Sequence, residues 1–123
     1  MSLSPRDAVA VMARRMARRA SGEIENAAMV RKQLPALVKA LVEKYNATRV
    51  VLVGSIARGM AREDADIDLA VEGLPPAKYF KALSDLAGIA GRSVDIIMVE
   101  EATPEVLGII GEGEVLHDER SAS

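Results

Sequence analysis

The stretch that most constrains the fold is residues 50–71, VVLVGSIARGMAREDADIDLAV, because it predicts two strands joined by a short connection. Residues 50–53 are an aliphatic, mostly β-branched run typical of a buried strand, and Gly54 ends this run where the chain must turn sharply. Residues 66–71 begin with charged and apolar residues in alternation, which is the pattern of a second strand. We therefore expect the chain to fold around a sheet.

The connection after the first strand has the features of a phosphate-binding turn. Gly54 lets the backbone approach a ligand closely, and Ser55 is expected to cap a short helix that runs through Arg58. The free N–H groups at the start of a helix, with the positive end of the helix dipole, suit a phosphate group. Gly54 and Ser55 are therefore candidate phosphate-binding residues.

Two aspartates open the second predicted strand. Side chains at i and i+2 of a strand project to the same face, so the carboxylates of Asp66 and Asp68 are expected to share one face. Ile67 and Leu69 then lie on the other face. Neighbouring carboxylates repel each other unless a cation lies between them, and Mg²⁺ prefers carboxylate oxygens together with nucleotide phosphates. The alternative interpretation is a solvated strand edge that carries two aspartates.

The two motifs together carry a family resemblance. G-S-x-x-R-G at residues 54–59, followed by D-x-D at residues 66–68, resembles the active-site signature of the DNA polymerase beta-like nucleotidyltransferase superfamily. The resemblance covers about residues 34–116, and the length of the chain is similar to that of the smallest members, the minimal nucleotidyltransferases. It implies an α/β (α+β) fold with helices packed on a small mixed sheet.

The resemblance also implies a role for each residue of the site. Residues 93–99, SVDIIMV, are predicted to form a later strand, in which Asp95 is the single charged residue. An aspartate there is costly to bury unpaired, so it is either the third carboxylate that the resemblance implies or a strand-end residue in water. The implied site comprises the catalytic and metal-binding Asp66, Asp68 and Asp95, and the substrate-binding Gly54, Ser55 and Arg58.

The reaction that the resemblance implies is Mg²⁺-dependent transfer of AMP from ATP to a hydroxyl group, with two metal ions in the site. Minimal nucleotidyltransferases are known as a family for pairing with small helical HEPN-domain toxins, which they neutralise by attaching AMP to a tyrosine. The resemblance thus implies a protein adenylyltransferase that is the antitoxin of a HEPN partner. Two other classes stay open: a small-molecule nucleotidyltransferase similar to the aminoglycoside-modifying enzymes, and a non-catalytic module that binds a nucleotide or a partner.

Composition excludes several other kinds of chemistry. The chain has no cysteine, so disulfides, thiolate metal sites and cysteine nucleophiles are excluded. Its three aromatic residues are too few for a platform on which single-stranded nucleic acid could stack, so direct nucleic-acid binding is not expected. No apolar run approaches the length of a membrane span, and the first residues lack the apolar core of a signal peptide. We expect no membrane contact and a cytoplasmic location.

The chain is predicted to have three parts: a basic helical extension (residues 1–33), a nucleotidyltransferase core (residues 34–118) and a polar tail (residues 119–123). Charge is unevenly distributed along them. Up to Ala61 there are eleven basic and four acidic residues, whereas from Arg62 onward there are five basic and fourteen acidic residues. The basic half could attract an acidic partner or nucleic acid, and the acidic half suits cations.

The extension is predicted to begin as a basic amphipathic helix with Ser4 as its cap, Pro5 in its first turn and Asp7 near its N-terminal dipole. Ser21 and Gly22 predict a break before a second helical segment. Apolar residues recur at helical spacing before the break: Val9, Met12, Ala13, Met16 and Ala20. We expect this apolar face to pack on the domain. A partner-binding helix is the next alternative, ahead of a membrane-binding or nucleic-acid-binding helix.

The remaining elements follow from apolar periodicity and from helix start signals. Pro35 predicts either a kink or a new helix, and residues 34–45 carry a strong apolar stripe. A helix is predicted at residues 77–87, another at residues 104–110, and a brief strand at residues 114–117. Three residues of the first of these helices are expected on its inner side: Phe80, Leu83 and Leu86.

Overall fold

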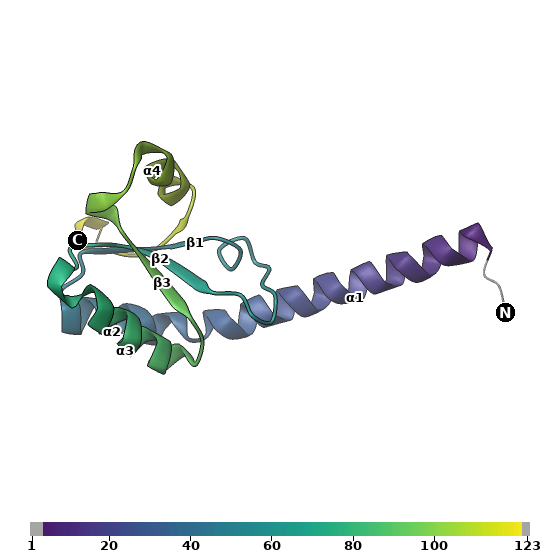
Figure 1. Ribbon diagram of the computed structural model, residues 1–123, viewed down its shortest axis with the longest axis horizontal. Helices are drawn as coiled ribbons and strands as arrows, with labels where there is room; N and C mark the ends of the chain where they lie inside the picture. Colours follow the sequence, from purple (N-terminus) through teal and green to yellow (C-terminus); the bar gives the residue numbers. More distant parts are fainter. Residues whose placement is uncertain (1–3, 122–123) are drawn as a thin grey trace.

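The computed structural model describes residues 4–121, in which helices pack on both faces of a four-stranded sheet (Figure 1). In chain order the helices and strands are α1 (Pro5–Arg31), α2 (Leu34–Tyr45), β1 (Arg49–Val53), β2 (Ile67–Glu72), α3 (Tyr79–Ala90), β3 (Val94–Met98), α4 (Pro104–Gly111) and β4 (Glu114–Asp118). Short 3₁₀ turns lie at Pro76–Lys78, Val99–Glu101 and Glu119–Ser121. Within residues 4–121, no helix combines the length and apolarity needed to cross a membrane. Residues 1–3 of the predicted extension and residues 122–123 of the predicted tail lie outside the described residues.

The strands are arranged in the order β3-β2-β1-β4. β1 pairs antiparallel with both β2 and β4, whereas β2 and β3 are parallel, which confirms the predicted mixed sheet. In this register Asp68 of β2 lies beside Val53 of β1 on one side and beside Asp95 of β3 on the other. The sheet therefore brings aspartates from two different strands to neighbouring positions.

The two faces of the sheet are covered by different helices (Figure 1). Because side chains alternate along a strand, Leu69 enters the larger core, to which α2, α3 and the end of α1 contribute. Val53 and Ala70 face the other way and pack with Ile110 of α4 in a smaller cluster. Asp68 precedes Ala70 by two residues and therefore lies on the α4 side of the sheet.

Helix α1 begins at its predicted cap. The hydroxyl of Ser4 accepts a hydrogen bond from the backbone N–H of Asp7, and the carboxylate of Asp7 accepts one from the backbone N–H of Ser4. The predicted break at Ser21 and Gly22 is wrong, because α1 continues unbroken to Arg31. A glycine inside a helix costs only about 1 kcal/mol relative to alanine, and the good helix formers that flank it offset this cost.

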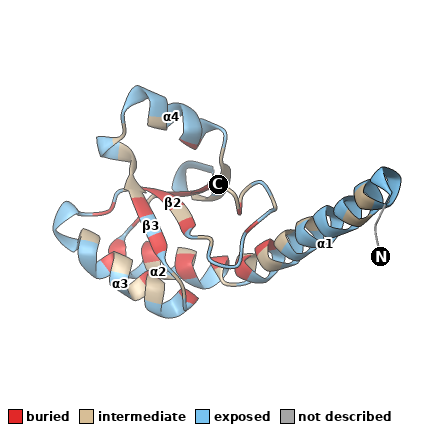
Figure 2. Ribbon diagram, turned by 45° about the vertical axis from the view of Figure 1, so that its right-hand side comes forward, coloured by how far each residue is buried: buried red, intermediate tan, exposed pale blue. Residues whose placement is uncertain are grey.

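The N-terminal part of α1 extends away from the rest of the molecule as a rod, here called the arm and defined as residues 5–22 (Figures 1 and 2). The expectation that its apolar face packs on the domain is wrong. Three apolar side chains of the arm are largely exposed: Val9 (68%), Met12 (60%) and Met16 (64%). Burial in the core is reached only near the other end of α1, at Ala27 and Val30.

Helices α2 and α3 cover the larger core. Pro35 lies in the first turn of α2, so a new helix starts there, which is one of the two predicted alternatives. In α3 the prediction that Phe80 lies on the inner side is wrong, because Phe80 is 80% exposed and packs edge-on against Tyr79. The buried face of α3 consists instead of Ala82, Leu86 and Ala90. Leu86 is therefore placed correctly by the sequence pattern and Phe80 is not.

A buried tyrosine links α2 to α3. The hydroxyl of Tyr45 donates to the carboxylate of Asp85, which also accepts from Lys44 at 2.7 Å. The hydrogen bonds from Lys44 and Tyr45 hold the pKa of Asp85 below its ordinary value. Burial, and then the hydrogen bond to Asp85, raise the pKa of Tyr45 to about 12. A carboxylate whose pKa is lowered by folding stabilises the fold above its ordinary pKa, and this stabilisation is lost as the pH falls through the lowered pKa.

Replacing Asp85 by asparagine is therefore expected to lower the melting temperature at neutral pH, and to reduce the further loss of stability on acidification. Thermal melts between about pH 3 and pH 7 measure both effects. Glu105→Gln, at an exposed position of α4, is the matched control because it also removes one carboxylate. Equal acid sensitivity of Asp85→Asn and the wild type would contradict the expectation.

Candidate functional site

The chain leaves β1 through a tight turn. Gly54 has a φ of +84°, a left-handed conformation that favours glycine. The carbonyl of Ser55 then accepts hydrogen bonds from the N–H groups of Arg58 (3.0 Å) and Met60 (3.2 Å). The predicted short helix through Arg58 is wrong, because these residues form turns. Within the described chain, however, the N–H groups of residues 55–57 donate to no backbone carbonyl, as at the start of a helix.

Gly54 and Asp68 approach each other closely. A Cβ atom at position 54 would lie 2.7 Å from Oδ2 of Asp68, which is closer than real Cβ atoms come to a neighbouring atom. The glycine at the end of β1 thus leaves the space that the carboxylate of Asp68 occupies. The backbone conformation favours glycine at position 54, and any larger residue there would displace the carboxylate of Asp68.

Asp68 lies among like charges. Its pKa is raised above the ordinary value of 3.8, first by burial and then by the negative charges of Asp95 and Asp66. Asp95 and Asp66 therefore both lie close enough to Asp68 to act on it electrostatically. A cation near Asp68 would relieve both the repulsion and the loss of hydration.

An open cavity of about 610 Å³ lies beside this turn and the start of β2. Four of the predicted site residues line it: Ser55, Arg58, Asp66 and Asp68. Gly54 adjoins it through its contact with Asp68. Asp95 is exposed at the neighbouring position of β3 and does not line the cavity. The structure thus gathers the turn and the first two aspartates around one space, with Asp95 next to it.

The carboxylates of this site can bind a metal ion when a bound ligand supplies further oxygen atoms. Within residues 4–121, no group of three or more histidine, cysteine, aspartate and glutamate side chains is placed to hold a metal ion by itself. The pair Asp66 and Asp68 does line one cavity, and Mg²⁺ is commonly bound by one or two carboxylates together with substrate phosphates. The donor set therefore fits Mg²⁺ when a nucleotide supplies further oxygens.

Helix α1 makes contacts with this region that the sequence did not predict. The side-chain amide of Asn26 donates to the carbonyl oxygens of Ala61 (3.1 Å) and Arg62 (2.6 Å). The N–H of Ala61 donates to the carbonyl of Glu23 at 3.0 Å, and Glu23 also lines the cavity. The segment that joins the turn to the aspartates is therefore fixed to α1. No motif or periodicity links positions so far apart in the sequence.

Replacing Asn26 by alanine is expected to destabilise the fold by about 1–3 kcal/mol, because two hydrogen bonds to backbone carbonyls are lost. Chemical denaturation measures the free energy of unfolding. Limited proteolysis between the turn and β2 should become faster in the same variant. Glu25→Ala, at the exposed neighbouring position of α1, is the control and should leave both properties close to those of the wild type.

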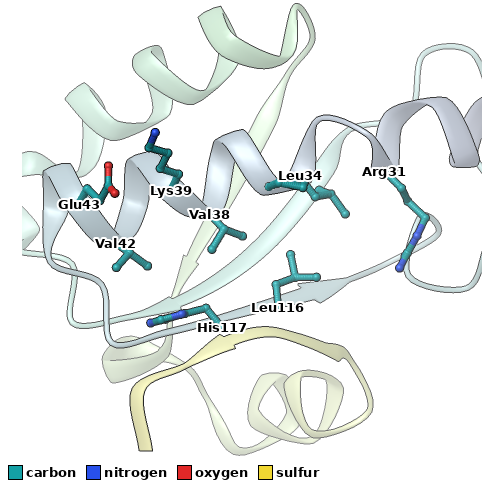
Figure 3. Close-up of a pocket in the computed structure, with 9 residues that line it drawn as sticks. Arg31, Leu34, Val38, Lys39, Val42, Glu43, Leu116 and His117 are labelled. Carbon is teal, nitrogen blue, oxygen red and sulfur yellow. The ribbon is translucent and has the colours of Figure 1, made fainter. Parts of the chain in front are cut away.

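A second hollow, of about 550 Å³, lies between α2 and β4 and is lined mainly by aliphatic side chains (Figure 3). Val38 and Val42 of α2 face Leu116 and His117 of β4 across it. Its single acidic lining residue is Glu43, and it shares no lining residue with the cavity at the aspartates. The chemistry of paired carboxylates therefore belongs to the first cavity.

Comparison with protein-family models shows which family this chain belongs to. Residues 34–116, about two thirds of the chain, match a family model described as the nucleotidyltransferase domain. The chain belongs to this family. The nucleotidyltransferase domain begins with α2 and ends in β4, so it includes the turn after β1 and all three aspartates, whereas α1 lies outside it.

Solved structures share the fold of this nucleotidyltransferase domain. A candidate minimal nucleotidyltransferase is 29% identical, with a TM-score of 0.62, over 73% of this chain and 93% of the other. A chain from a toxin-antitoxin crystal structure with AMP-PNP is 21% identical, with a TM-score of 0.59, over 71% of this chain and 72% of the other. A chain from the complex of a tri-AMPylated Shewanella oneidensis HEPN toxin with its MNT antitoxin is 18% identical, with a TM-score of 0.55, over 76% and 74%. No protein with curated annotation matches the chain.

Proposed function

We propose that this chain is a Mg²⁺-dependent nucleotidyltransferase that moves AMP from ATP to a hydroxyl group of a partner protein. The observation that carries the proposal is the meeting of the turn after β1 with Asp66 and Asp68 around one open cavity. A turn with free N–H groups suits phosphate, and the carboxylates suit the cation that accompanies it. Membership of the nucleotidyltransferase domain family supports the reaction class.

In the proposed site, Asp66 and Asp68 hold Mg²⁺ together with the phosphates of ATP, and Asp95 is the third carboxylate, on the acceptor side. Bound there, the metal supplies electrostatic stabilisation of the phosphates and of the leaving group. The N–H groups at Gly54 and Ser55 bind the triphosphate, and Arg58 contributes a positive charge at the rim of the cavity.

The proposed reaction is an in-line displacement at the α-phosphorus. The acceptor oxygen forms a bond to this phosphorus while the bond to the bridging oxygen of pyrophosphate breaks, and pyrophosphate leaves with the bonding electrons. Asp95 lies beside Asp68 in the register of β2 and β3 and accepts the proton of the hydroxyl. Its exposure leaves it accessible to an acceptor that approaches from solvent.

The proposed acceptor is a tyrosine of a HEPN-domain toxin, which makes this chain its antitoxin. One structural neighbour is an MNT antitoxin complex whose HEPN toxin is tri-AMPylated, and another toxin-antitoxin neighbour was crystallised with AMP-PNP. The catalytic cavity is open, as the docking of a protein side chain requires. We expect the protein encoded beside this chain to be a HEPN-domain protein, and incubating it with the chain and Mg²⁺-ATP should add the mass of AMP to it. If the HEPN protein gains no such mass while this chain binds ATP, neutralisation by complex formation replaces transfer.

Nucleotide binding can be tested separately with the chain alone. Saturating Mg²⁺-ATP, at about 100 times its Kd, should stabilise the fold by about 2.7 kcal/mol and raise the melting temperature. Ser55→Leu should weaken binding at least tenfold in calorimetric titration, because a bulky side chain beside the turn blocks the phosphates. Ser84→Leu, at an exposed position of α3, makes the same change elsewhere and should bind as the wild type does. Equal affinities for the two variants would place the nucleotide elsewhere.

A further inference from the structure

The apolar stripe that packs α1 on the core continues along the arm, where no other residue of the described range 4–121 covers it. Ala27 and Val30 are buried. On the same face of the helix, the preceding positions at steps of three or four residues are apolar back to Val9, and Glu23 is the exception. The large apolar side chains that this stripe exposes on the arm are Val9, Met12 and Met16. The arm spans about 27 Å at the rise of an α-helix. Exposed apolar side chains in such a row are typical of a helix that packs against a partner.

The arginines of the arm are placed in two sets. Arg15 and Arg19 follow Met12 and Met16 by three residues each and therefore border the stripe. Arg14 and Arg18 lie on the opposite side of the helix. A groove that fits this arm must accordingly be apolar along its floor and acidic along the edge that meets Arg15 and Arg19.

This arrangement argues against other occupants of the stripe. In an antiparallel pair of arms packed through their stripes, the edges that carry Arg15 and Arg19 would face each other, and like charges repel. The arm has no tryptophan, phenylalanine or leucine, which are the residues that hold amphipathic helices in membrane surfaces. Nucleic acid would satisfy the arginines but leave the methionine stripe uncovered. A protein surface satisfies both features.

The base of the arm lies next to the catalytic cavity. Glu23, directly after the arm, lines this cavity, and Asn26 holds the segment that leads to Asp66. A protein bound along the arm is therefore held beside the cavity. We infer that the arm is the docking site for the acceptor protein, which covers Val9, Met12 and Met16 with an apolar groove edged by carboxylates; this inference rests on the function proposed above.

The test measures the affinity of this chain for the protein encoded beside it, which the proposed function expects to be a HEPN protein. Met12→Gln/Met16→Gln should weaken binding at least about tenfold, because glutamine preserves the helix and removes the apolar stripe. The control variant Ala10→Gln/Ala17→Gln also introduces two glutamines, but on the other side of the arm, and it should bind as the wild type does. Arg15→Gln/Arg19→Gln should weaken binding and reduce its dependence on salt more than Arg14→Gln/Arg18→Gln does.

Two further measurements separate this inference from the function it rests on. All four variants should show the full thermal stabilisation by Mg²⁺-ATP, because none of these positions lines the catalytic cavity. Unchanged HEPN affinity in Met12→Gln/Met16→Gln, or no binding of the HEPN protein by the wild type, overturns the docking inference even if Mg²⁺-ATP binds. Light scattering of the chain alone should give a monomer; a dimer that Met12→Gln/Met16→Gln dissociates would assign the stripe to a second copy and overturn the inference as well.

Discussion

Replacing Asp68 by asparagine is expected to reduce AMP transfer by about a thousandfold, the equivalent of about 4 kcal/mol in the transition state. The carboxylate lost in this variant lies between Gly54 and the neighbouring strand that carries Asp95. Asp66→Asn should have an effect of similar size, because both carboxylates line the cavity. Initial rates of transfer at saturating Mg²⁺-ATP measure both losses.

The same Asp68 variant should be more stable than the wild type when no metal is present. Folding raises the pKa of Asp68, so the ionised carboxylate destabilises the folded protein without metal, and stability declines as the pH rises through that raised pKa. Asparagine removes this penalty, and the melting temperature at neutral pH should therefore rise. Asp64→Asn is the matched control: Asp64 lines the cavity, but it is not a proposed metal ligand. Asp64→Asn should retain most activity, and an equal loss would indicate that only the net charge of the cavity matters.

Replacing Gly54 by alanine should abolish metal-dependent nucleotide binding, and a second glycine provides its control. Gly54 and Gly59 both have a φ of +84°, so alanine at either position is expected to cost about 1–3 kcal/mol of stability through backbone strain. A Cβ atom at position 54 would meet Oδ2 of Asp68 at 2.7 Å, whereas at position 59 it would meet nothing within 4 Å. Only Gly54→Ala therefore displaces a carboxylate of the proposed site.

Calorimetric titration with Mg²⁺-ATP and denaturant unfolding should separate the two effects. Both glycine variants should lose stability to a similar extent, while Gly59→Ala keeps nucleotide affinity within a few-fold of the wild type. Gly54→Ala should lose affinity for Mg²⁺-ATP by at least about a hundredfold, because the turn after β1 and Asp68 shift together. If Gly59→Ala loses as much affinity as Gly54→Ala, the conformation of the whole turn matters, and the contact with Asp68 does not.

The strands could be predicted from the sequence because their signals are local. The aliphatic run at residues 50–53 and the apolar strand around Asp95 were predicted to within a residue or two of β1 and β3. The start of α1 could be predicted equally well, because Ser4 caps it and Pro5 lies in its first turn. Each of these signals acts within one turn or one strand, so no knowledge of the tertiary structure is required.

The errors arose where tertiary contacts or helix phase decide the outcome. Ser21 and Gly22 were expected to break α1, but an intact helix tolerates one glycine when its neighbours favour helix. Phe80 was expected to be buried, yet α3 presents Ala82, Leu86 and Ala90 to the core, and this phase turns Phe80 outward. The four-residue spacing of Ala82, Leu86 and Ala90 was the better guide to its buried side.

The candidate site was predictable only as a set of motifs. Gly54, Ser55 and the first two aspartates were identified because glycine turns and alternating carboxylates leave a local pattern. The contribution of α1 could not be found in this way, because Asn26 bonds to backbone carbonyls of Ala61 and Arg62, whose positions do not depend on side-chain identity at those residues. A side chain that recognises main chain imposes no matching residue on its partner.

The exposure of the arm has a consequence for how quickly its sequence can change. Val9, Met12 and Met16 lie outside both clusters of buried residues. Substitutions at these positions therefore do not disturb the packing of the sheet or the turn after β1. Such substitutions can therefore accumulate without loss of the fold. If the arm is the docking site inferred above, partner choice and chemistry are encoded in separate parts of the chain. Exchanging arms between related chains is then expected to redirect the same reaction to a different acceptor.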